Sequence, residues 1–481
     1  MSFRAHKTKI VCTIGPATDS LEMMCAMITA GMNIARLNYS HGDFATHAEV
    51  IKTLRKAEQK TKTNITIMAD LPGPKIRIGQ LKQESFILKP NDHIILSTKP
   101  LIGDWTKVSV SLPELPQAVR EGDIIFLNDG LIQLSVISVS GHEILCRIVV
   151  GGELRANKGL NLPGINLGIS AFTKHDEMCL KSALENGVDA ISQSFVNTPE
   201  DVIAVRNAAK AMGYDPFIIA KMERSGALER IDDILAVSDG MMIARGDLGV
   251  EIPIEQLAIV QKRLITRANL FGKPVITATQ MLESMVRNPR PTRAEATDVA
   301  NAVLDGTDCI MLSEESAIGK YPIDAISTLA KIAEFTETHR DEADKIRNYP
   351  DFNRDDNPHI TDTLAHDVYY TVEHLKPELL VAHTVSGHTA RMISRFKLGV
   401  WILAVSTSHN VCQGLRFSFG VKPLLVNKTP KDWKKLITQQ IQCHNIKSGV
   451  AILVEVPSED NPGINHRLEI ISDLSRFCKL E

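Results

Sequence analysis

The sequence predicts an α/β fold: a (β/α)8 TIM barrel, a small all-β lid domain inserted into it, and a C-terminal α/β domain. Three observations predict it, namely eight short apolar runs, a long break after the third run, and a renewed α/β pattern near the C-terminus. Buried parallel strands read as near-continuous apolar runs. Each run stops at charged or hydroxyl-bearing residues, and the active site of such a barrel lies at the C-terminal strand ends. The runs therefore predict both the fold and the location of its site.

The eight runs are short and are separated by segments with helical character. They are Ile10–Cys12, Met32–Ala35, Ile65–Ala69, Val188–Ser194, Phe217–Ala220, Met241–Ala244, Val275–Ile276 and Cys309–Leu312. Thr198 before Pro199, with acidic residues next in sequence, predicts the start of one of the helices. The barrel pattern ends after a helix expected from Pro322 to His339.

Between the third and fourth runs the sequence changes to period-two alternation with glycine-marked turns. Ile132–Val136 alternates cleanly and Ile144–Val150 alternates in part, which predicts a small β domain. The segment is too long for an ordinary loop of a barrel. Pro72–Pro74 and Pro163–Gly164 bracket it and suit hinges, so we expect a lid over the site. The same composition also fits a passive insertion.

The C-terminal quarter returns to alternating helix and strand after a polar stretch, 340–357, that is expected to be a linker. Candidate strands are Leu379–His383, Trp401–Val405 and Val450–Val454, which predict a doubly wound α/β domain. The expected domains are the barrel at 1–72 and 165–341, the lid at 73–164, and a regulatory domain at 355–481.

Composition narrows the class of function. The 481 residues include 54 Lys and Arg against 57 Asp and Glu, and this net charge of −3 favours neither a nucleic-acid nor a membrane partner. No apolar stretch reaches the roughly 20 residues of a membrane span. The N-terminal residues run directly into the first strand, which leaves no room for a signal peptide. The eight cysteines form no Cys-x-x-Cys pair, so we expect reduced thiols and a cytoplasmic location.

Charged residues at the strand ends suggest the chemistry. Arg36 and Lys221 supply cations, while Glu223 and Asp247 supply two carboxylates from adjacent strands. Two carboxylates suit Mg²⁺, which keeps its other positions for water and substrate. The glycines of 244–249 allow backbone amides to approach an anion at a helix start.

Other polar residues follow the same set of runs. Asp70 is expected beside Asn38 and Ser40, and Thr279 and Ser313 add hydroxyl groups. Taken singly, each residue has a structural explanation, for example Lys221 and Glu223 as a surface ion pair. Their joint placement on one face of a barrel favours a phosphoryl-transfer site.

Five long segments resemble the pyruvate kinase family. They are 13–17, 36–42, 241–251, 273–285 and 289–306, the last containing Pro289–Glu295 and Asp298–Gly306. The resemblance implies transfer of the phosphoryl group of phosphoenolpyruvate to ADP, which gives pyruvate and ATP, by a cytoplasmic homotetramer that needs Mg²⁺ or Mn²⁺.

The resemblance also implies roles for residues of this chain. Lys221, Arg36, Thr279 and Ser313 would be catalytic, and Glu223 and Asp247 would bind the metal. The substrate would contact Arg36, Lys221, Thr279 and the backbone of Ala244, Arg245, Gly246 and Asp247. The nucleotide would bind at Pro16, Asn38, His41, Arg77 and Lys158. A threonine is a poor acid, so Thr279 is expected to position a water.

The chain departs from the family pattern after the third run. K⁺-dependent members read Asp-Thr-Lys-Gly-Pro-Glu, whereas this chain has Asp70, Leu71 and Pro72, with Lys75 in the place of the glutamate. The residues that match K⁺ ligands, Asn38, Ser40 and Asp70, remain. We expect the Lys75 ammonium to replace K⁺, since two cations in one pocket would repel each other. The alternative is that Lys75 points to solvent and K⁺ still binds.

A loop in the C-terminal domain matches the position where relatives bind a phosphorylated activator. It contains Thr384, Ser386, Gly387, His388 and Thr389 before an expected helix. Hydroxyls at a helix start suit a phosphate, although an ordinary capped helix explains them equally well. His388 stands where Arg or Lys is frequent, and Arg224 and Glu314 are further departures; Glu314 has no explanation in the sequence.

Two other functions fit parts of the sequence. One is a Mg²⁺-dependent carbon–carbon lyase with a pyruvate enolate intermediate on a similar barrel. Such an enzyme would need no ADP site, lid or third domain. The other is a non-catalytic homologue, which would be expected to lose Lys221, Glu223, Asp247 or Thr279, and all four are present.

Overall fold

The computed structural model describes residues 3–165, 168–340, 360–444, 446, 449–457 and 463–472. Eight parallel strands close into a barrel in the order β1-β16-β15-β14-β13-β12-β3-β2. The predicted fold class is thus confirmed. Their bounds are β1 Lys9–Thr13, β2 Ile34–Asn38, β3 Thr66–Leu71, β12 Ala190–Gln193, β13 Phe217–Met222, β14 Gly240–Ala244, β15 Val275–Ala278 and β16 Cys309–Leu312. Each of the eight apolar runs forms one strand.

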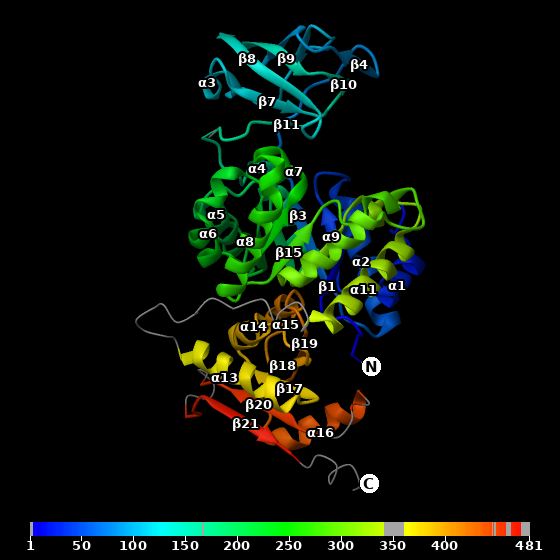
Figure 1. Ribbon diagram of the computed structural model, residues 1–481, viewed down its shortest axis with the longest axis vertical. Coiled ribbons are helices and arrows are strands. Elements are labelled where there is room, and N and C mark those ends of the chain that lie inside the picture. Colours follow the sequence, from blue (N-terminus) through cyan, green and yellow to red (C-terminus); the bar gives the residue numbers. More distant parts are fainter. Residues whose placement is uncertain are drawn as a thin grey trace.

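Helices surround the barrel (Figure 1). The longer ones are α1 Leu21–Ala30, α2 Phe44–Thr61, α4 Lys174–Glu185, α5 Pro199–Ala211, α6 Ile231–Val237, α8 Leu257–Leu270, α9 Arg293–Asp305 and α11 Pro322–Thr338. Short helical turns follow four strands, namely η1 Ser225–Leu228, α7 Arg245–Glu251 with η2 Ile254–Gln256, η3 Glu283–Val286 and α10 Glu314–Ala317. Helix α5 starts as predicted, with Thr198 as N-cap, and its backbone amide donates to Asp201 Oδ2 at 3.0 Å.

The inserted β domain lies beyond the end of the barrel opposite the C-terminal domain (Figure 1). A six-stranded sheet in the order β11-β7-β8-β9-β5-β6 and the pair β10-β4 form it. The elements are β4 Ser85–Leu88, β5 His93–Ser97, β6 Lys107–Ser109, α3 Leu115–Ala118, β7 Ile124–Leu127, β8 Ile132–Ser140, β9 Glu143–Val150, β10 Gly152–Arg155 and β11 Leu160–Asn161. The β8–β9 pairing shifts register at two places, which accounts for imperfect alternation in the sequence.

The connection from β3 to the β domain passes very close to the barrel at Gly73. This residue has φ of 65°, and an added Cβ would lie 2.8 Å from the Phe195 ring and 3.1 Å from Ser194 Cβ. Its amide donates to Asp176 Oδ1 at 2.9 Å. Only glycine fits this passage, because it tolerates positive φ and has no side chain.

The C-terminal domain has a five-stranded sheet in the order β19-β18-β17-β20-β21. Its elements are α13 Ile360–Leu375, β17 Leu379–His383, α14 His388–Ser394, β18 Ile402–Ser406, α15 His409–Leu415, β19 Val421–Leu425, α16 Trp433–Cys443, β20 Ala451–Glu455 and β21 Arg467–Ile471. The three predicted strands are present, and β19 and β21 are additional. The expected linker, apart from Arg340, lies outside the described residues.

Phe417 of the C-terminal domain closes the base of the barrel. Its side chain is fully buried in the cluster of residues that point into the barrel, and its ring stacks on Phe217 with centroids 5.2 Å apart. Two hydrogen bonds between side chains and the backbone tie the same loop to the start of β16: Cys309 Sγ donates to Phe417 O at 3.1 Å, and the Phe419 amide donates to Oδ1 of the preceding Asp308 at 2.8 Å. The barrel core therefore includes a residue of the C-terminal domain.

None of the described helices is both long enough and apolar enough to cross a membrane. The seven cysteines within the described residues are all free, and five of them are buried.

Replacing Phe417 by Ala should destabilise the protein by about 3–5 kcal/mol, because the substitution leaves a cavity at the barrel base. Chemical unfolding followed by circular dichroism measures the loss. Phe335→Ala is the matched control, since that ring is 67 % exposed, and it should cost less than about 1 kcal/mol. Equal losses in the two variants would contradict the role of Phe417 in the barrel core.

Candidate active site

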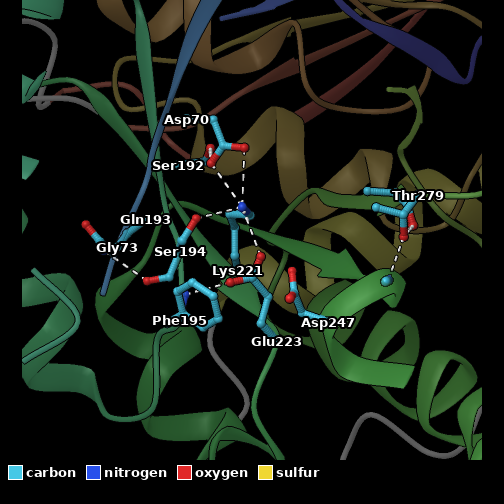
Figure 2. A network of polar contacts seen from close by, with 12 residues as sticks. Asp70, Gly73, Ser192, Gln193, Ser194, Phe195, Lys221, Glu223, Asp247 and Thr279 are labelled. Carbon is cyan, nitrogen blue, oxygen red and sulfur yellow. Dashed lines mark hydrogen bonds and ion pairs between the residues drawn. The ribbon is translucent and has the colours of Figure 1, made fainter. Parts of the chain in front are cut away.

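A buried ion-pair network joins the C-terminal ends of three strands (Figure 2). Lys221 from β13 is its centre: Nζ lies 3.1 Å from Asp70 Oδ1 and 2.9 Å from Glu223 Oε1, and donates to Ser194 Oγ at 2.7 Å. Arg36 at the end of β2 donates through Nε to Asp70 Oδ2 at 2.8 Å. The β2–β3 register places Asn38 beside Asp70 and Arg36 beside Met68, so the guanidinium reaches along the sheet to the carboxylate.

Because these side chains are buried, the pKa of each one depends on the charges of its neighbours. The side chains of Asp70 and Glu223 are each 2 % exposed, and that of Lys221 is 10 % exposed. Burial alone would raise the pKa of Asp70, but Lys221 and Arg36 lower it below its usual value. Burial would likewise lower the pKa of Lys221, yet Asp70 and Glu223 raise it. Lys221 therefore stays charged in this site.

Glu223 and Asp247 form a pair of neighbouring carboxylates. Burial first, and then the charge of Asp247, raises the pKa of Glu223 in spite of Lys221. Figure 2 shows the Asp247 carboxylate beside that of Glu223. The Phe195 amide donates to Glu223 Oε2 at 2.7 Å, which holds the carboxylate in position. Phe195 itself has φ of 58°, an uncommon conformation for a bulky residue.

Among the described residues, no cluster of three or more His, Cys, Asp or Glu side chains could hold a metal by itself. The Glu223–Asp247 pair can bind a metal ion only if water or substrate supplies the other ligands. Mg²⁺ is usually bound in this way. Both carboxylates face ammonium groups, Glu223 that of Lys221 and Asp247 that of Lys75 at 3.8 Å. Each carboxylate of the pair thus already faces one positive charge.

Lys75 points toward the site. Its Nζ lies 3.8 Å from Asp247 Oδ1, its side chain is 31 % exposed, and its Cε runs close to Gly159 of the β domain. Burial chiefly, and then the charges of Arg77, Arg36 and Lys75, lowers the pKa of His41. His41, Arg77 and Lys75 therefore share one electropositive region. Arg77 is held there by donating to Asn157 O at 2.9 Å.

Thr279 stands across the site from Lys221, at the end of β15 (Figure 2). It has φ of 66°, donates through Oγ1 to Ala278 O at 2.6 Å and accepts from the Gly246 amide at 2.8 Å. The amide expected to bind a substrate carboxylate is thus paired with Thr279. Ser313 follows β16, the neighbouring strand, and its amide donates to Glu315 Oε2 at 2.7 Å.

Arg245 contributes to the site through its backbone, because its guanidinium points elsewhere. Nη1 lies 2.7 Å from Asp298 Oδ2, and Nη2 donates to Thr279 O at 2.7 Å. The side chain therefore fixes the strained backbone at Thr279 and is not available to a ligand at the strand ends.

The remaining residues predicted for the site differ in exposure. Pro16, Ser40 and His41 are exposed and Asn38 is half-buried at the ends of β1 and β2, Leu71 is buried at the end of β3, and Lys158 is half-buried in the β domain. The loop after β17 has Ser386 and His388 exposed and Thr384, Gly387 and Thr389 buried. Gly387, with φ of 81°, is the N-cap of α14, so no hydroxyl side chain occupies the cap position.

Sequence analysis missed the partners that hold the network. Ser192 Oγ donates to Asp70 Oδ1 at 2.8 Å, Ser194 accepts from Lys221, and the Phe195 amide binds Glu223. A signal was present, because two serines spaced two residues apart at a strand end share one face.

Comparison with known proteins identifies the family. The family model described as "Pyruvate kinase, barrel domain" matches residues 5–326, and "Pyruvate kinase, alpha/beta domain" matches residues 362–455. A pyruvate kinase of Thermococcus litoralis is 45 % identical over 430 residues, covering 89 % of this chain and 90 % of that protein. One from Geobacillus stearothermophilus is 39 % identical over 480 residues, covering 98 % and 81 %. The crystal structure of a pyruvate kinase from Cryptosporidium parvum has a TM-score of 0.88 at 32 % identity, covering 97 % and 96 %.

Asp70→Asn should destabilise the folded protein by about 3 kcal/mol near neutral pH, because Arg36 and Lys221 lose their shared counter-charge. The pKa of Asp70 is lowered in the folded state, so its contribution is present above the ordinary carboxyl pKa and is lost as pH falls through the folded value. The difference from wild type should shrink in acid.

Chemical unfolding at several pH values measures this effect. Glu49→Gln is the control, since its ion pair with Lys52 is exposed and screened by solvent, so its loss should leave stability almost unchanged. A difference between Asp70→Asn and wild type that stays constant from neutral to acid pH would contradict the electrostatic origin.

Proposed function

Because this chain belongs to the pyruvate kinase family and is a phosphotransferase, we propose a division of labour among its strand-end residues in the reaction of phosphoenolpyruvate with ADP. The observation that carries the proposal is the buried Lys221, held between Asp70 and Glu223 at 3.1 and 2.9 Å. A charged amine fixed at the strand ends can stabilise a transferring phosphoryl group without reorganising.

In this proposal Lys221 neutralises the phosphoryl group and Arg36 holds one of its oxygens. Glu223 and Asp247 hold Mg²⁺ or Mn²⁺, which the family generally needs and which supplies positive charge at the reacting oxygens. Their adjacency and the raised pKa of Glu223 support this assignment. The backbone amides of 244–247 would bind the substrate carboxylate. The Gly246 amide donates to Thr279 Oγ1 in this structure and would donate to the substrate carboxylate instead.

Thr279 and Ser313 are proposed to position a water that gives the enolate carbon its proton. Their places at the ends of neighbouring strands β15 and β16 support this role. The Thr279 hydroxyl donates to its own strand's carbonyl and accepts from Gly246, so it is held in one orientation. A threonine hydroxyl is too weak an acid to act alone at neutral pH.

The nucleotide is proposed to lie between the barrel mouth and the inserted β domain. Pro16, Asn38, His41, Arg77 and Lys158 would contact it, and the electropositive region around His41 supports phosphate binding there. We infer that the β domain, residues 73–164, closes over this side as a lid. The barrel would then comprise 1–72 and 165–341, and the regulatory domain 355–481; the boundary region 341–359 lies outside the described residues.

Lys75 is proposed to substitute for K⁺. Its ammonium lies 3.8 Å from Asp247 Oδ1 and supplies one fixed positive charge in this region, as K⁺ would. Asp70, the matching carboxylate ligand, has both oxygens engaged by Arg36, Lys221 and Ser192. Asn38, Ser40 and the backbone at Leu71 alone would make a poor cation site.

The loop containing Thr384, Ser386, Gly387, His388 and Thr389 is proposed to bind a phosphorylated effector. Exposed Ser386 and His388 at a helix start support this assignment, and Arg391 reaches back to Ser386 O at 3.2 Å. From the family we also infer a homotetramer in the cytoplasm. A thermal-shift screen with sugar phosphates and AMP tests the effector site; no stabilisation by any of them would count against it.

Lys221→Met should lower kcat at least about 100-fold in a coupled assay of pyruvate formation from phosphoenolpyruvate and ADP, because a fixed charge at the transition state is lost. The wild-type protein should be active in the same assay, whereas a carbon–carbon lyase would be silent. Lys434→Met, an exposed lysine of the C-terminal domain, is the control and should keep full activity. Unchanged turnover of Lys221→Met would refute the role of Lys221.

Wild-type turnover should change less than about twofold when K⁺ is added to Na⁺- and K⁺-free buffer, whereas Lys75→Glu should gain at least about tenfold on that addition. Lys89→Glu, at an exposed lysine of the β domain, makes the same charge change away from the site and should behave as wild type. Strong K⁺ activation of the wild-type protein would remove the basis for the Lys75 proposal.

A further inference from the structure

The two connections between the barrel and the inserted β domain meet the barrel at one small cavity. Pro74–Ile76 and Leu160–Leu162 line it from the side of the β domain, and Phe195, Arg224 and Glu251 line it from the barrel. Its volume is about 20 Å³, room for a single water molecule, so the side chains around it are closely packed. Ile76 and the two leucines are buried. The root of the β domain is therefore seated against three barrel residues.

The ring of Phe195 receives contacts from two directions along the chain. It lies against Gly73, where an added Cβ would come within 2.8 Å of ring atom Cδ2. The guanidinium carbon of Arg224 lies 5.5 Å from the centre of the same ring. A guanidinium group over an aromatic face is attracted by the charge distribution of the ring. The ring is thus held both by the connection to the β domain and by one arginine.

The backbone around Phe195 holds both members of the Lys221–Glu223 pair (Figure 2). The Phe195 amide donates to Glu223 Oε2 at 2.7 Å, and Oγ of the preceding Ser194 accepts from Lys221 Nζ at 2.7 Å. The φ of 58° at Phe195 is maintained only if its surroundings fix it, because the left-handed region is unfavourable for a bulky residue. A shift of the ring would therefore turn the peptide that holds Glu223.

Arg224, where the chain departs from the family pattern, follows Glu223 directly and is half-buried. Within the described residues, its guanidinium makes no hydrogen bond or close ion pair. Its contacts there are the Phe195 ring and the charge of Glu251. The arginine is therefore free to stack on the ring, since no carboxylate fixes it elsewhere.

Glu251 at the end of α7 keeps a negative charge near Arg224. Burial chiefly raises its pKa to about 7, and the charge of Arg224 acts in the opposite direction. The amide and hydroxyl of Ser225 donate to the same carboxylate. Helix α7 also carries Asp247, so Arg224 lies between the end of β13 and the helix that bears the second carboxylate of the pair.

We propose that Arg224 is a positioning residue for the metal site. Together with Gly73 it fixes the Phe195 ring, and the ring keeps the Phe195 amide on Glu223. Because both connections of the β domain pack into the same cavity, displacement of that domain loosens the ring and its return restores it. The inference rests on the proposed function of Glu223 as a metal ligand; Arg224 itself touches neither metal nor substrate.

Hydrogen exchange of the full chain, resolved at the Phe195 amide by mass spectrometry, tests this contact without metal or substrate. Arg224→Ala should speed exchange of that amide at least about tenfold, while the amides of β1, across the barrel from β13, keep wild-type protection. Arg224→Lys keeps the charge but lacks the planar group that stacks, so it should give an intermediate rate. Arg120→Ala, at an exposed arginine of the β domain, is the matched control and should behave as wild type.

The assay of pyruvate formation gives a second readout. Arg224→Ala should raise the Mg²⁺ concentration for half-maximal turnover by about threefold or more, because a residue that orients a ligand changes metal affinity. The KM for ADP should change less than about twofold, since Arg224 acts through Glu223. An inactive wild-type protein would refute the proposed function, whereas an active one with unchanged exchange in Arg224→Ala would refute the role of Arg224 alone.

Two results of the exchange experiment would overturn the inference. One is a Phe195 amide that exchanges at the wild-type rate in Arg224→Ala. The other is faster exchange throughout the barrel, β1 included, which would make Arg224 a general contributor to stability. If Arg224→Ala does not fold, Arg224→Lys replaces it and should still speed exchange of the Phe195 amide by about threefold or more.

Discussion

Four charged side chains from three barrel strands, Arg36, Asp70, Lys221 and Glu223, are buried against one another at the mouth of the barrel. No member of this network is stable there without the others, because a buried charge without a partner costs several kcal/mol. The network therefore requires the register of β2, β3 and β13 to be held within a fraction of an ångström. Everything proposed for catalysis starts from this arrangement.

The rest of the molecule maintains that register. Each strand buries both faces, and the interior layer at the base is completed by Phe417 from the C-terminal domain. Above the site, Gly73 passes against Ser194 and Phe195, the residues that position Lys221 and Glu223. The root of the β domain and the Lys221–Glu223 pair thus share contacts. A change in the position of the β domain therefore has a short structural path to the strand ends.

The two ends of the barrel use charge in different ways. At the mouth, cations and carboxylates alternate, so the site is balanced and holds Lys221 and Asp70 ionised. At the base, Lys9 and Lys422 have neutral partners, Val421 O and His444, and burial lowers the pKa of both lysines. The arrangement at the mouth suits chemistry on a bound substrate. Phe417 and the interior of the barrel lie between the two ends.

The sequence by itself determined the barrel, its inserted β domain and which strand ends carry chemistry, because a buried parallel strand must be apolar along its length and its polar end is then conspicuous. Strands β19 and β21 escaped prediction, since Pro423 and Lys422 interrupt the first and the second is a half-exposed edge. Only the tertiary structure decided that Arg245 supports Thr279 from behind, that Ser192 and Ser194 hold the network, and that Lys75 faces Asp247. These are contacts between residues far apart in the chain, and their geometry depends on how the closed barrel brings neighbouring strand ends together, which residue spacing does not specify.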